Sequence, residues 1–414
     1  MQTLLVRGGR ALRGTVRIHG AKNSVLPILA ASVLCTEPCT LTDCPALLDV
    51  AAAEEILRHL GCRTRRRGET ITVDAVGVNR TEIPPCLMEK MRASVIFLGA
   101  LLGRFGECEL SLPGGCNLGS RPIDYHIRAL EALGVTAEQY GTALRFTWKE
   151  RRGGCVTLPY PSVGATENLI LAAVTVPEPV IVRNAAAEPE IADLCRFLAA
   201  MGAHIRGIGC GELQIYGGTP LHGGSYRIMP DRVETATYLA MTAACGGEIC
   251  LHNTDADLLL PVLSVLRRGG CRITAEEDSL TLTREKPLRG IGTVVTEVYP
   301  GFPTDAQAPL MAAFLCAKGE SRWVETVFRG RFCHVPQLQK FGASIQVEDN
   351  AATVTGVERL HGAEAAATDL RGGAGILLAA LAAEGESRIT CAELLQRGYA
   401  DLTENLCALG AVIK

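Results

Sequence analysis

A short glycine signature recurs six times along this chain of 414 residues, each time at the end of a run with helical character. The signature glycines are Gly61, Gly134, Gly202, Gly270, Gly342 and Gly410. By subtraction of their numbers they stand 73, 68, 68, 72 and 68 residues apart, which exceeds the roughly 20 to 50 residues of a solenoid repeat. Because a glycine commonly ends a helix, this even spacing predicts six copies of one small α/β module.

A second feature repeats upstream of each signature glycine. It is a run rich in alanine and leucine that is apolar on nearly all faces, which is typical of a helix inside a core. These runs cover residues 21–34, 91–102, 162–175, 232–244, 304–315 and 368–383. A short β-type run, such as residues 180–183, lies between the two helices of a module. We therefore expect each module to contain a strand, a buried helix, a strand, an amphipathic helix and a strand.

The size and composition fit two domains of three modules each. The chain is 48% hydrophobic and 21% charged, so it can bury two cores. The boundary is expected near Gly223-Gly224-Ser225, after the third signature and before the fourth buried helix.

Charge and hydropathy exclude several kinds of partner. The net charge is -3, and the only basic run, Arg63 with Arg65-Arg66-Arg67, is interpreted as a solvated hairpin tip rather than a nucleic-acid surface. Residues 1–20 mix charged and apolar side chains, unlike a signal peptide, and no apolar stretch is long enough for a membrane span. We expect a cytoplasmic protein that binds neither nucleic acid nor membrane.

The seventeen cysteines are scattered, without C-x-x-C pairs or histidines at zinc spacing. We therefore expect no metal site and interpret most of them as small buried residues. Cys116 differs, because residues 112–122 contain three glycines and two prolines and are typical of a loop. We expect its thiol to be accessible, and Arg121 nearby favours the thiolate and can hold an anion beside it.

Polar residues recur where the buried helices begin. They are Lys22, Asn23, Arg92, Ser162, Asp231, Arg232, Asp305 and Arg371, and Ser162 is followed by Val163 and Gly164. Helix capping explains Ser162, Asp231 and Asp305. It does not explain Lys22, Arg92 or Arg371, since a cation near a helix N-terminus opposes the helix dipole. We infer that an external anion compensates these cations in a cleft lined by helix N-termini.

These residues belong to motifs that together resemble the UDP-N-acetylglucosamine enolpyruvyl transferase family over the whole chain. The motifs are Gly20-Ala21-Lys22-Asn23, Met91-Arg92-Ala93-Ser94, the Cys116 loop through Arg121-Pro122-Ile123-Asp124, Ser162-Val163-Gly164-Ala165-Thr166, Glu188-Pro189-Glu190, Pro230-Asp231-Arg232, Pro303-Thr304-Asp305, Glu325-Thr326-Val327-Phe328, Thr368-Asp369-Leu370-Arg371 and Arg397-Gly398-Tyr399. The resemblance implies a two-domain inside-out α/β barrel of six repeated αβ modules, with helices inside and sheets outside. It implies a first domain of residues 21–229 and a second domain made of residues 1–20 and 230–414.

The resemblance also implies an activity. Members of the family move the enolpyruvyl group of phosphoenolpyruvate onto the 3′-hydroxyl of UDP-N-acetylglucosamine and release phosphate, in the first committed step of peptidoglycan synthesis. Such an addition and elimination needs an acid, a base and cations. Cys116 matches the acid, which can also attach to phosphoenolpyruvate, and Asp305 matches the base. The residues that match the phosphoenolpyruvate clamp are Lys22, Arg121 and Arg397.

The positions that match the family's nucleotide-sugar site are dispersed along the chain. They are Asn23, Arg92, Arg121, Pro122, Ile123, Asp124, Tyr125, Ser162, Val163, Gly164, Asp305 and Val327. Arg331 and Arg371 are further substrate-binding candidates, whereas Glu188, Glu190 and Asp231 are expected to hold the architecture. The two substrates are the expected partners, and the protein is expected to be a monomer without a cofactor.

The chain departs from the family pattern at three places. Tyr160-Pro161 stands where some members carry a lysine, so that ring stacking can replace a nucleotide contact. Three glycines follow Arg371, at 372, 373 and 375, and they cost about 2 kcal/mol in helix propensity, so a looser helix end is expected. Leu394-Leu395-Gln396 precedes Arg397, where more polar residues including an aspartate are expected, which weakens the prediction of how Arg397 is positioned.

Two other functions stay open. A diverged paralogue could bind UDP-N-acetylglucosamine with little turnover, although the intact set of Lys22, Cys116, Asp305 and Arg397 argues against it. The sister enzyme that acts on shikimate 3-phosphate shares the fold and the phosphoenolpyruvate chemistry. The Gly-Gly-Cys loop counts against that enzyme, because the sister family does not depend on a cysteine acid.

Overall fold

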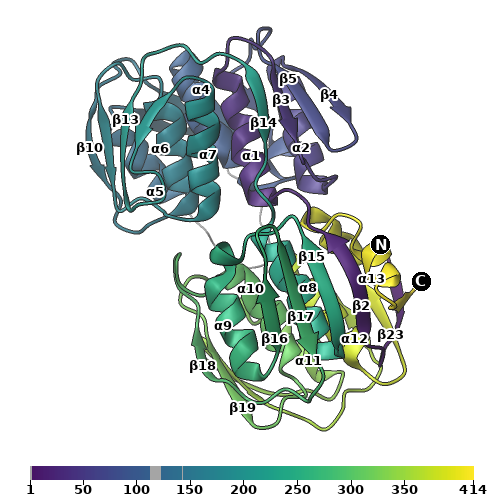
Figure 1. Cartoon of the computed structure of the whole chain (residues 1–414). Helices are drawn as coiled ribbons and strands as arrows, with labels where there is room; N and C mark the ends of the chain where they lie inside the picture. The colour runs from purple at the N-terminus through teal and green to yellow at the C-terminus, as the bar shows by residue number, and fades with distance from the viewer. Residues whose placement is uncertain (1, 112–122, 142) are drawn as a thin grey trace. The chain divides into compact units, whose positions relative to one another are not determined.

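The computed structural model describes residues 2–111, 123–141 and 143–414, which form two compact units. One unit contains the residues up to His19 together with Pro230–Lys414, and the other runs from Gly20 to Met229 (Figure 1). The chain leaves the second of these at Pro230, a few residues after Gly223. This happens because Gly224–Arg227 (β14) still pairs with a strand of that unit.

The unit from Gly20 to Met229 contains three modules. The first consists of β14, α1 (Lys22–Ala31), β3 (Cys39–Thr42), α2 (Leu48–Leu60), β4 (Arg63–Arg67) and β5 (Thr70–Asp74). The second consists of β6 (Glu82–Ile83), α3 (Pro85–Met88), the 3-10 turn η2 (Arg92–Ile96), α4 (Phe97–Phe105), β7 (Glu107–Ser111), α5 (Asp124–Glu131), β8 (Thr136–Tyr140) and β9 (Ala143–Thr147). The third consists of β10 (Gly154–Thr157), α6 (Val163–Ala173), β11 (Val180–Arg183), α7 (Pro189–Ala200), β12 (His204–Arg206) and β13 (Glu212–Tyr216).

The other unit repeats the same plan. Its first module consists of β2 (Leu12–Arg17), α8 (Arg232–Cys245), β15 (Gly247–His252), α9 (Leu260–Gly269), β16 (Arg272–Ala275) and β17 (Ser279–Arg284). The second consists of β18 (Gly292–Val295), α10 (Thr304–Ala313), β19 (Glu320–Val324), α11 (Val335–Gln339), β20 (Ser344–Glu348) and β21 (Ala351–Thr355). The third consists of β22 (Glu364–Ala366), α12 (Leu370–Ala382), β23 (Glu386–Thr390), the 3-10 turn η4 (Ala392–Arg397), α13 (Leu402–Ala408), β24 (Val412–Ile413) and β1 (Leu4–Arg7).

Each module contributes one four-stranded sheet of the same topology. The first strand runs parallel to the second, and the last two strands form an antiparallel pair, which is a hairpin in the order β10-β11-β13-β12 but joins β1 to β24 in the sheet that holds both ends of the chain. The predicted module is therefore wrong in one respect, because two strands rather than one follow the second helix. The added strand widens the sheet so that it covers both helices of the module.

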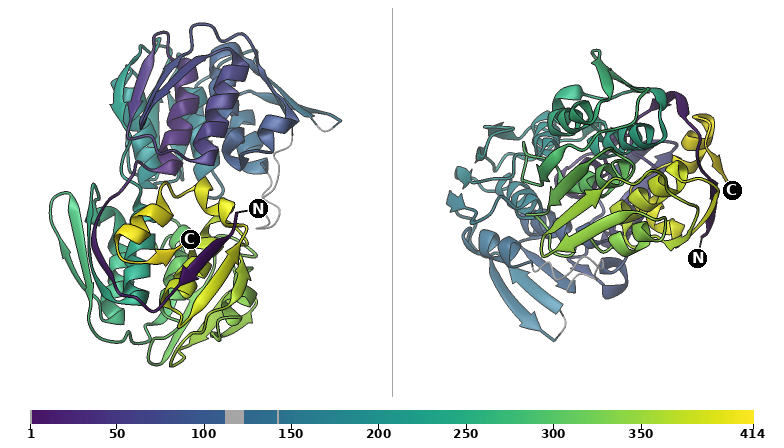
Figure 2. Two further views of the ribbon diagram at one scale, coloured as in Figure 1. Left: turned by 90° about the vertical axis from the view of Figure 1, so that its right-hand side faces the viewer. Right: turned by 90° about the horizontal axis from the view of Figure 1, so that it is seen from below.

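Three sheets are completed by strands from distant parts of the sequence. β14 joins β3, β2 joins β15, and β1 lies between β23 and β24. Figure 2 shows β1, in purple, among the yellow strands near the C-terminus. The segment before His19 is thereby built into two sheets of the unit that holds Pro230–Lys414.

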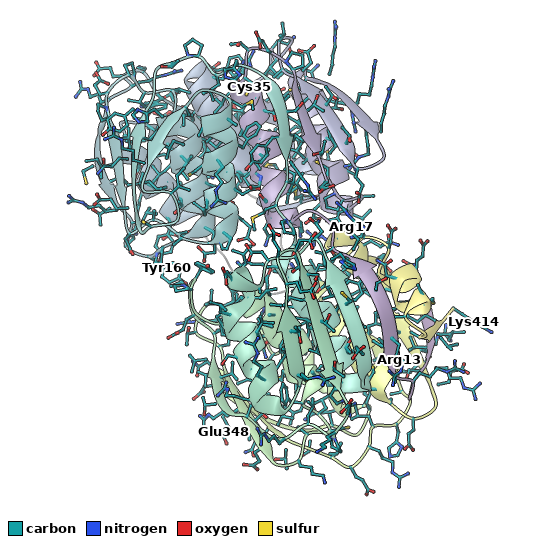
Figure 3. The ribbon with its side chains drawn as sticks, viewed as in Figure 1. Arg13, Arg17, Cys35, Tyr160, Glu348 and Lys414 are labelled. Carbon is teal, nitrogen blue, oxygen red and sulfur yellow. The ribbon has the colours of Figure 1, made fainter. Side chains whose placement is uncertain are left out.

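The six predicted buried helices are confirmed. α4 packs against α1 and α6 in one unit, and α8, α10 and α12 pack against one another in the other. The sheets present an apolar face to these helices and a polar face to solvent, so that Trp323 on β19 is buried while Glu320 and Arg322 are exposed. In Figure 3 the charged side chains, such as Arg13 of β2, project from the outer faces. The helices are inside and the sheets outside, as the resemblance implies.

The six signature glycines share one backbone conformation. Their φ angles lie between 89° and 106°, in the left-handed region that glycine adopts without a steric cost. At Gly61, for example, the backbone N–H donates to Arg58 and the N–H of Cys62 donates to Leu57, which closes the end of α2. The repeat in the sequence is therefore a repeat of helix C-caps.

Three further expectations concern the surface and the thiols. The basic run is confirmed as a hairpin strand, β4, paired with β5. Only seven of the described cysteines are buried, so the expectation that most are buried is wrong. Cys155 on β10 and Cys210 in the turn between β12 and β13, for example, are exposed. No helix in the described ranges is both long and apolar enough to cross a membrane.

Candidate functional site

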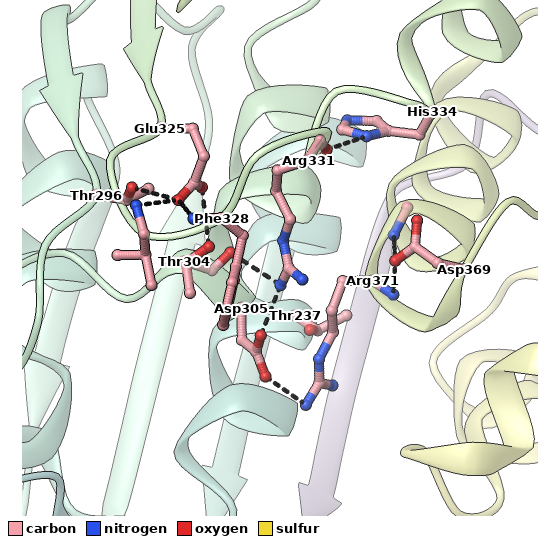
Figure 4. Close-up of polar contacts among 12 residues, drawn as sticks. Thr237, Thr296, Thr304, Asp305, Glu325, Phe328, Arg331, His334, Asp369 and Arg371 are labelled. Carbon is pink, nitrogen blue, oxygen red and sulfur yellow. Dashed lines mark hydrogen bonds and ion pairs between the residues drawn. The ribbon is translucent and has the colours of Figure 1, made fainter. Parts of the chain in front are cut away.

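Asp305 lies in the first turn of α10 between two arginines from other elements. Its Oδ1 accepts a hydrogen bond from Arg331 Nη2 at 2.6 Å, and its Oδ2 accepts one from Arg371 Nη2 at 3.3 Å (Figure 4). Both guanidinium side chains are 4% exposed, whereas the carboxylate is 29% exposed. The carboxylate is therefore more accessible than the two cations that hold it.

The two guanidinium groups keep hydrogen-bond donors that the described residues do not satisfy. Arg331 Nε, Arg371 Nε and Arg371 Nη1 are buried and have no partner within the described part of the chain. Buried polar groups in folded proteins are nearly always bonded. Three unmatched N–H groups on two fixed cations are therefore suited to an anionic ligand, since guanidinium forks match carboxylate and phosphate geometry.

Aromatic rings support both arginines. The Arg371 guanidinium carbon lies 5.2 Å from the centre of the Tyr399 ring, and that of Arg331 lies 5.6 Å from the Phe328 ring. Burial lowers the pKa of Arg371, but Tyr399, Asp305 and Asp231 together raise it by more, so that it lies above its ordinary value. Arg371 is consequently a cation over the whole working pH range.

Glu325 organises the loop that carries Val327. Its Oε1 accepts hydrogen bonds from the Val327 and Phe328 backbone N–H groups at 2.8 and 3.0 Å. Its Oε2 accepts one from Thr304 Oγ1 at 2.8 Å, at the start of α10. One buried carboxylate thus fixes Val327 and Phe328 relative to the helix that bears Asp305 (Figure 4).

The start of α12 is capped and tightly packed. Asp369 Oδ1 accepts the backbone N–H groups of Arg371 and Gly372, each at 3.0 Å. A Cβ atom at Gly372 would lie 2.5 Å from Asp369 Oδ2, and one at Gly375 would lie 3.0 Å from the carbonyl oxygen of Ala308 in α10. The looser helix end expected from glycine propensity is therefore not found, because these glycines permit close contacts that a side chain would obstruct.

The segment before Arg397 packs on the same helix start. Leu395 is 4% exposed, and its Cδ2 lies 3.3 Å from the position of a Cβ at Gly373. The N–H of Ala392 donates to the carbonyl of Gln2 at 3.1 Å, which ties η4 to the β1 side of the unit. The apolar departure from the family pattern has a packing role, and Arg397 is half-buried at the end of η4.

In the unit from Gly20 to Met229, Lys22 has a carboxylate partner of its own. Lys22 Nζ lies 2.6 Å from Asp49 Oδ2, and the two side chains are 12% and 4% exposed. The inference that only an external anion compensates the cations at helix starts is therefore wrong for Lys22, and Asp305 likewise compensates Arg371. The partners were missed because they are distant in sequence. Asn23, next to Lys22, is exposed.

The start of α6 has the capped geometry expected of it. Ser162 Oγ accepts the N–H of Ala165 at 3.4 Å, and Val163 and Gly164 open the helix with half-buried side-chain positions. The departure at Tyr160 is a stacking residue, since its ring lies parallel to that of Tyr125 with centroids 6.2 Å apart. Tyr125 follows Asp124 at the start of α5, and Ile123 is the N-cap position of that helix.

Four predicted site residues lie wholly or partly outside the described part of the chain. Cys116, Arg121 and Pro122 lie outside the described residues, and Arg92 is described only as the first residue of η2. Tyr399 is a residue that the sequence interpretation missed. The Arg397-Gly398-Tyr399 motif could have indicated Tyr399 as a site residue. Its contact with Arg371, 28 positions earlier, could not be read from the sequence.

The fold and this cluster of charges define a class of protein. Over residues 6–406 the chain matches the family described as EPSP synthase (3-phosphoshikimate 1-carboxyvinyltransferase). The enolpyruvyl transferase NikO from Streptomyces tendae is similar in structure, with a TM-score of 0.91, 27% identity and coverage of 100% of this chain and 98% of that chain. The chain is therefore an enzyme of the enolpyruvyl transferases, with their two-domain inside-out α/β fold.

Relatives of higher identity narrow the family. UDP-N-acetylglucosamine 1-carboxyvinyltransferases from Zymomonas mobilis and Finegoldia magna are 44% and 42% identical, covering 100% of this chain and 99% of each relative. Within the enolpyruvyl transferases, the chain belongs to the UDP-N-acetylglucosamine 1-carboxyvinyltransferase family. An EPSP synthase from Acinetobacter baumannii, at 17% identity and a TM-score of 0.78 over 100% of this chain and 99% of that chain, shares the fold.

Proposed function

We propose that this enzyme transfers the enolpyruvyl group of phosphoenolpyruvate to the 3′-hydroxyl of UDP-N-acetylglucosamine and releases phosphate. One observation carries this proposal: the buried guanidinium groups of Arg331 and Arg371 bond to Asp305 and keep three N–H donors without a partner in the described ranges. A substrate with both a carboxylate and a phosphate suits such donors. The similar proteins are named for UDP-N-acetylglucosamine, which supports this nucleotide sugar as the acceptor.

The proposed chemistry follows from these charges. Asp305 takes the proton of the sugar hydroxyl as its oxygen bonds to the enol carbon, and Cys116 supplies a proton to the methylene carbon. In the elimination the Cys116 thiolate takes back a proton from that carbon, the bond to the phosphate oxygen breaks, and the released phosphate takes the proton held by Asp305. Lys22, Arg121 and Arg397, with Arg331 and Arg371, stabilise the substrate's charges and the transition state. No metal or cofactor is needed for this balance.

For the nucleotide sugar, we propose that the start of α6 binds the diphosphate. Val163 and Gly164 are the first residues of a buried helix, whose free backbone N–H groups and dipole favour phosphate. The stacked Tyr125 and Tyr160 rings lie near this helix start and suit a nucleotide. The other proposed contacts are Asn23, Arg92, Arg121, Pro122, Ile123, Asp124, Asp305 and Val327.

The division into units supports a domain assignment. We propose a first domain of residues 21–229 and a second made of residues 1–20 and 230–414, because the two compact units change at Gly20 and Pro230. We also propose that the enzyme is a cytoplasmic monomer of peptidoglycan synthesis, and hence of cell-wall formation, and that the epoxide antibiotic fosfomycin alkylates Cys116.

The decisive experiment measures phosphate release from phosphoenolpyruvate with UDP-N-acetylglucosamine or shikimate 3-phosphate as acceptor, for the wild type and Cys116→Ala. Release only with the nucleotide sugar, strongly reduced in the variant, is expected. Release with shikimate 3-phosphate would point to the sister activity. Nucleotide-sugar binding without release would indicate a diverged binding protein. Intact-mass analysis with fosfomycin and the nucleotide sugar should add one inhibitor to the wild type and none to the variant.

A further inference from the structure

Tyr399 lies at the centre of the inner helices of its unit. It is 3% exposed and follows Arg397 by two residues. Its ring is the platform beneath the Arg371 guanidinium of α12, and its hydroxyl lies 3.0 Å from Thr237 Oγ1 on α8. Since Arg371 in turn contacts Asp305 on α10, Tyr399 connects the N-terminal parts of three inner helices.

The direction of the Tyr399 hydroxyl bond is determined by its partner. Thr237 Oγ1 donates its only proton to the carbonyl of Val233 at 2.8 Å. The Tyr399 hydroxyl must therefore be the donor in the bond to Thr237, whose own exposure is 0%. This bond fixes the hydroxyl end of the Tyr399 ring relative to α8.

The ring is the main support that orients the Arg371 guanidinium. The guanidinium bonds to the Asp305 carboxylate through Nη2 and also interacts with the Tyr399 side chain, whereas its Nε and Nη1 have no partner in the described ranges. The carboxylate bond alone would let the planar group turn about that contact, whereas the Tyr399 side chain, with its ring centre 5.2 Å away, restricts the group to one plane. In this orientation two buried N–H groups, on Nε and Nη1, have no partner in the described ranges.

We propose that Tyr399 is a positioning residue: its ring, held by Thr237, keeps Arg371 oriented so that Nε and Nη1 bind the anionic group of phosphoenolpyruvate. This inference rests on the proposed function for the identity of the substrate. The anion site itself depends only on the geometry of Arg371, Tyr399 and Thr237.

The test separates the ring from its hydroxyl. Tyr399→Leu removes the platform and is expected to raise KM for phosphoenolpyruvate about tenfold, with KM for UDP-N-acetylglucosamine changed less than about twofold. Tyr399→Phe keeps the ring and loses the Thr237 bond, so an increase of about three- to fivefold is expected. Thr237→Val should match Tyr399→Phe, and the double variant should be no worse than either, because both remove the same bond.

Tyr238→Phe is the matched control. Tyr238 is a fully buried neighbour on α8 whose hydroxyl accepts a bond from Asn405 at 3.1 Å, so this variant loses a buried hydroxyl that bonds to Asn405 rather than to Thr237. Its melting temperature should fall without a change in KM for phosphoenolpyruvate. If Tyr399→Leu behaves like this control, with lower stability and an unchanged KM, the positioning role is refuted.

A second measurement keeps the inference separate from the proposed reaction. Inorganic phosphate is titrated calorimetrically into the wild type and into the Tyr399 and Tyr238 variants. Weaker phosphate binding by Tyr399→Leu alone supports the positioning role even where the wild type releases no phosphate from phosphoenolpyruvate. Equal phosphate binding by all variants, or none by the wild type, would overturn it.

Discussion

Asp305 and Arg371, 66 residues apart in sequence, are joined by a hydrogen bond of 3.3 Å between Oδ2 and Nη2. The bond brings together the first turns of two inner helices, α10 and α12, which pack along each other. Arg331 binds the other carboxylate oxygen, so the aspartate is held by two cations without being buried. Its negative charge is therefore stabilised, while the carboxylate stays partly exposed.

Replacing this aspartate should separate proton transfer from substrate binding. Asp305→Asn keeps the shape but removes the proposed base, and kcat is expected to fall by about 10² to 10⁴. The affinity for phosphoenolpyruvate should not weaken, since a negative charge is removed from beside two cations. Steady-state kinetics and calorimetric titration measure the two effects, with Asp278→Asn in the exposed β16–β17 hairpin as the control. A variant with wild-type kcat would exclude Asp305 as the base.

The glycines of α12 should be required for packing. In Gly375→Ala the new methyl group would lie 3.0 Å from the carbonyl oxygen of Ala308, in a contact between two inner helices. We expect a loss of about 1 to 3 kcal/mol in stability, although alanine has the better helix propensity by about 1 kcal/mol. The control, Gly211→Ala, has no atom within 4 Å of the new methyl group and should leave the melting temperature unchanged. A more stable Gly375→Ala protein would contradict the packing role.

A buried carboxyl group in α6 should make stability depend on pH. Burial raises the pKa of Glu167 well above its ordinary value, and Glu190 and Glu188 raise it further. A carboxyl group with a raised pKa in the folded state stabilises the fold below its unfolded pKa, and this contribution is lost as the pH rises through the folded pKa. Glu167→Gln should therefore be more stable than the wild type at pH 8 and similar to it at pH 4.

Thermal unfolding at the two pH values measures this effect. The control is Glu212→Gln, which removes an exposed carboxylate of β13 in the same unit and should show no comparable pH dependence. If Glu167→Gln and the wild type keep the same difference in melting temperature at both pH values, Glu167 does not titrate as expected.

His334 should have the opposite effect in the other unit. It is fully buried, its Nδ1 donates to the Arg331 carbonyl at 3.1 Å, and burial lowers its pKa to about 4, with Asp369 opposing and Arg331 adding to the shift. Because the unfolded state binds the proton more tightly, the contribution is complete above about pH 6.5 and is lost as the pH falls toward 4. In His334→Asn the loss of stability at acid pH should be smaller, because this histidine's contribution, on the order of 3 kcal/mol, is absent.

Melting curves at pH 7 and pH 5 test this prediction. The exposed His222 supplies the control variant His222→Asn, whose curve should follow that of the wild type. An unchanged acid-side loss in His334→Asn would show that other groups cause it.

The sequence predicts the parts of this fold that depend on local patterns. The buried helices and the six C-cap glycines follow from apolar runs and from a backbone conformation that favours glycine. The pairing of β14 with β3 and of β2 with β15 could not be predicted, because short strands carry no signal for a partner about 200 residues away.

The same limit applies to the candidate site. Lys22, Asp305 and Arg371 could be selected from charge at helix starts, but the contact of Lys22 with Asp49 depends on the folded arrangement. Helix propensity wrongly indicated a loose start for α12. Propensity is a local quantity, whereas the close approach of α10 at Ala308 leaves little room for a side chain at Gly375.

β1 and β2 each pair with strands made much later, so the order of synthesis affects when their sheets can form. Asn253 bonds to the carbonyl of Ile18 across 235 residues, so at about 5 to 20 residues per second Ile18 waits roughly 10 to 50 s on the ribosome for this partner. The unit from Gly20 to Met229 contains all the strands of its own sheets and can fold during that interval. The strands that complete the unit bearing Asp305 are thus among the first residues made and among the last to be paired.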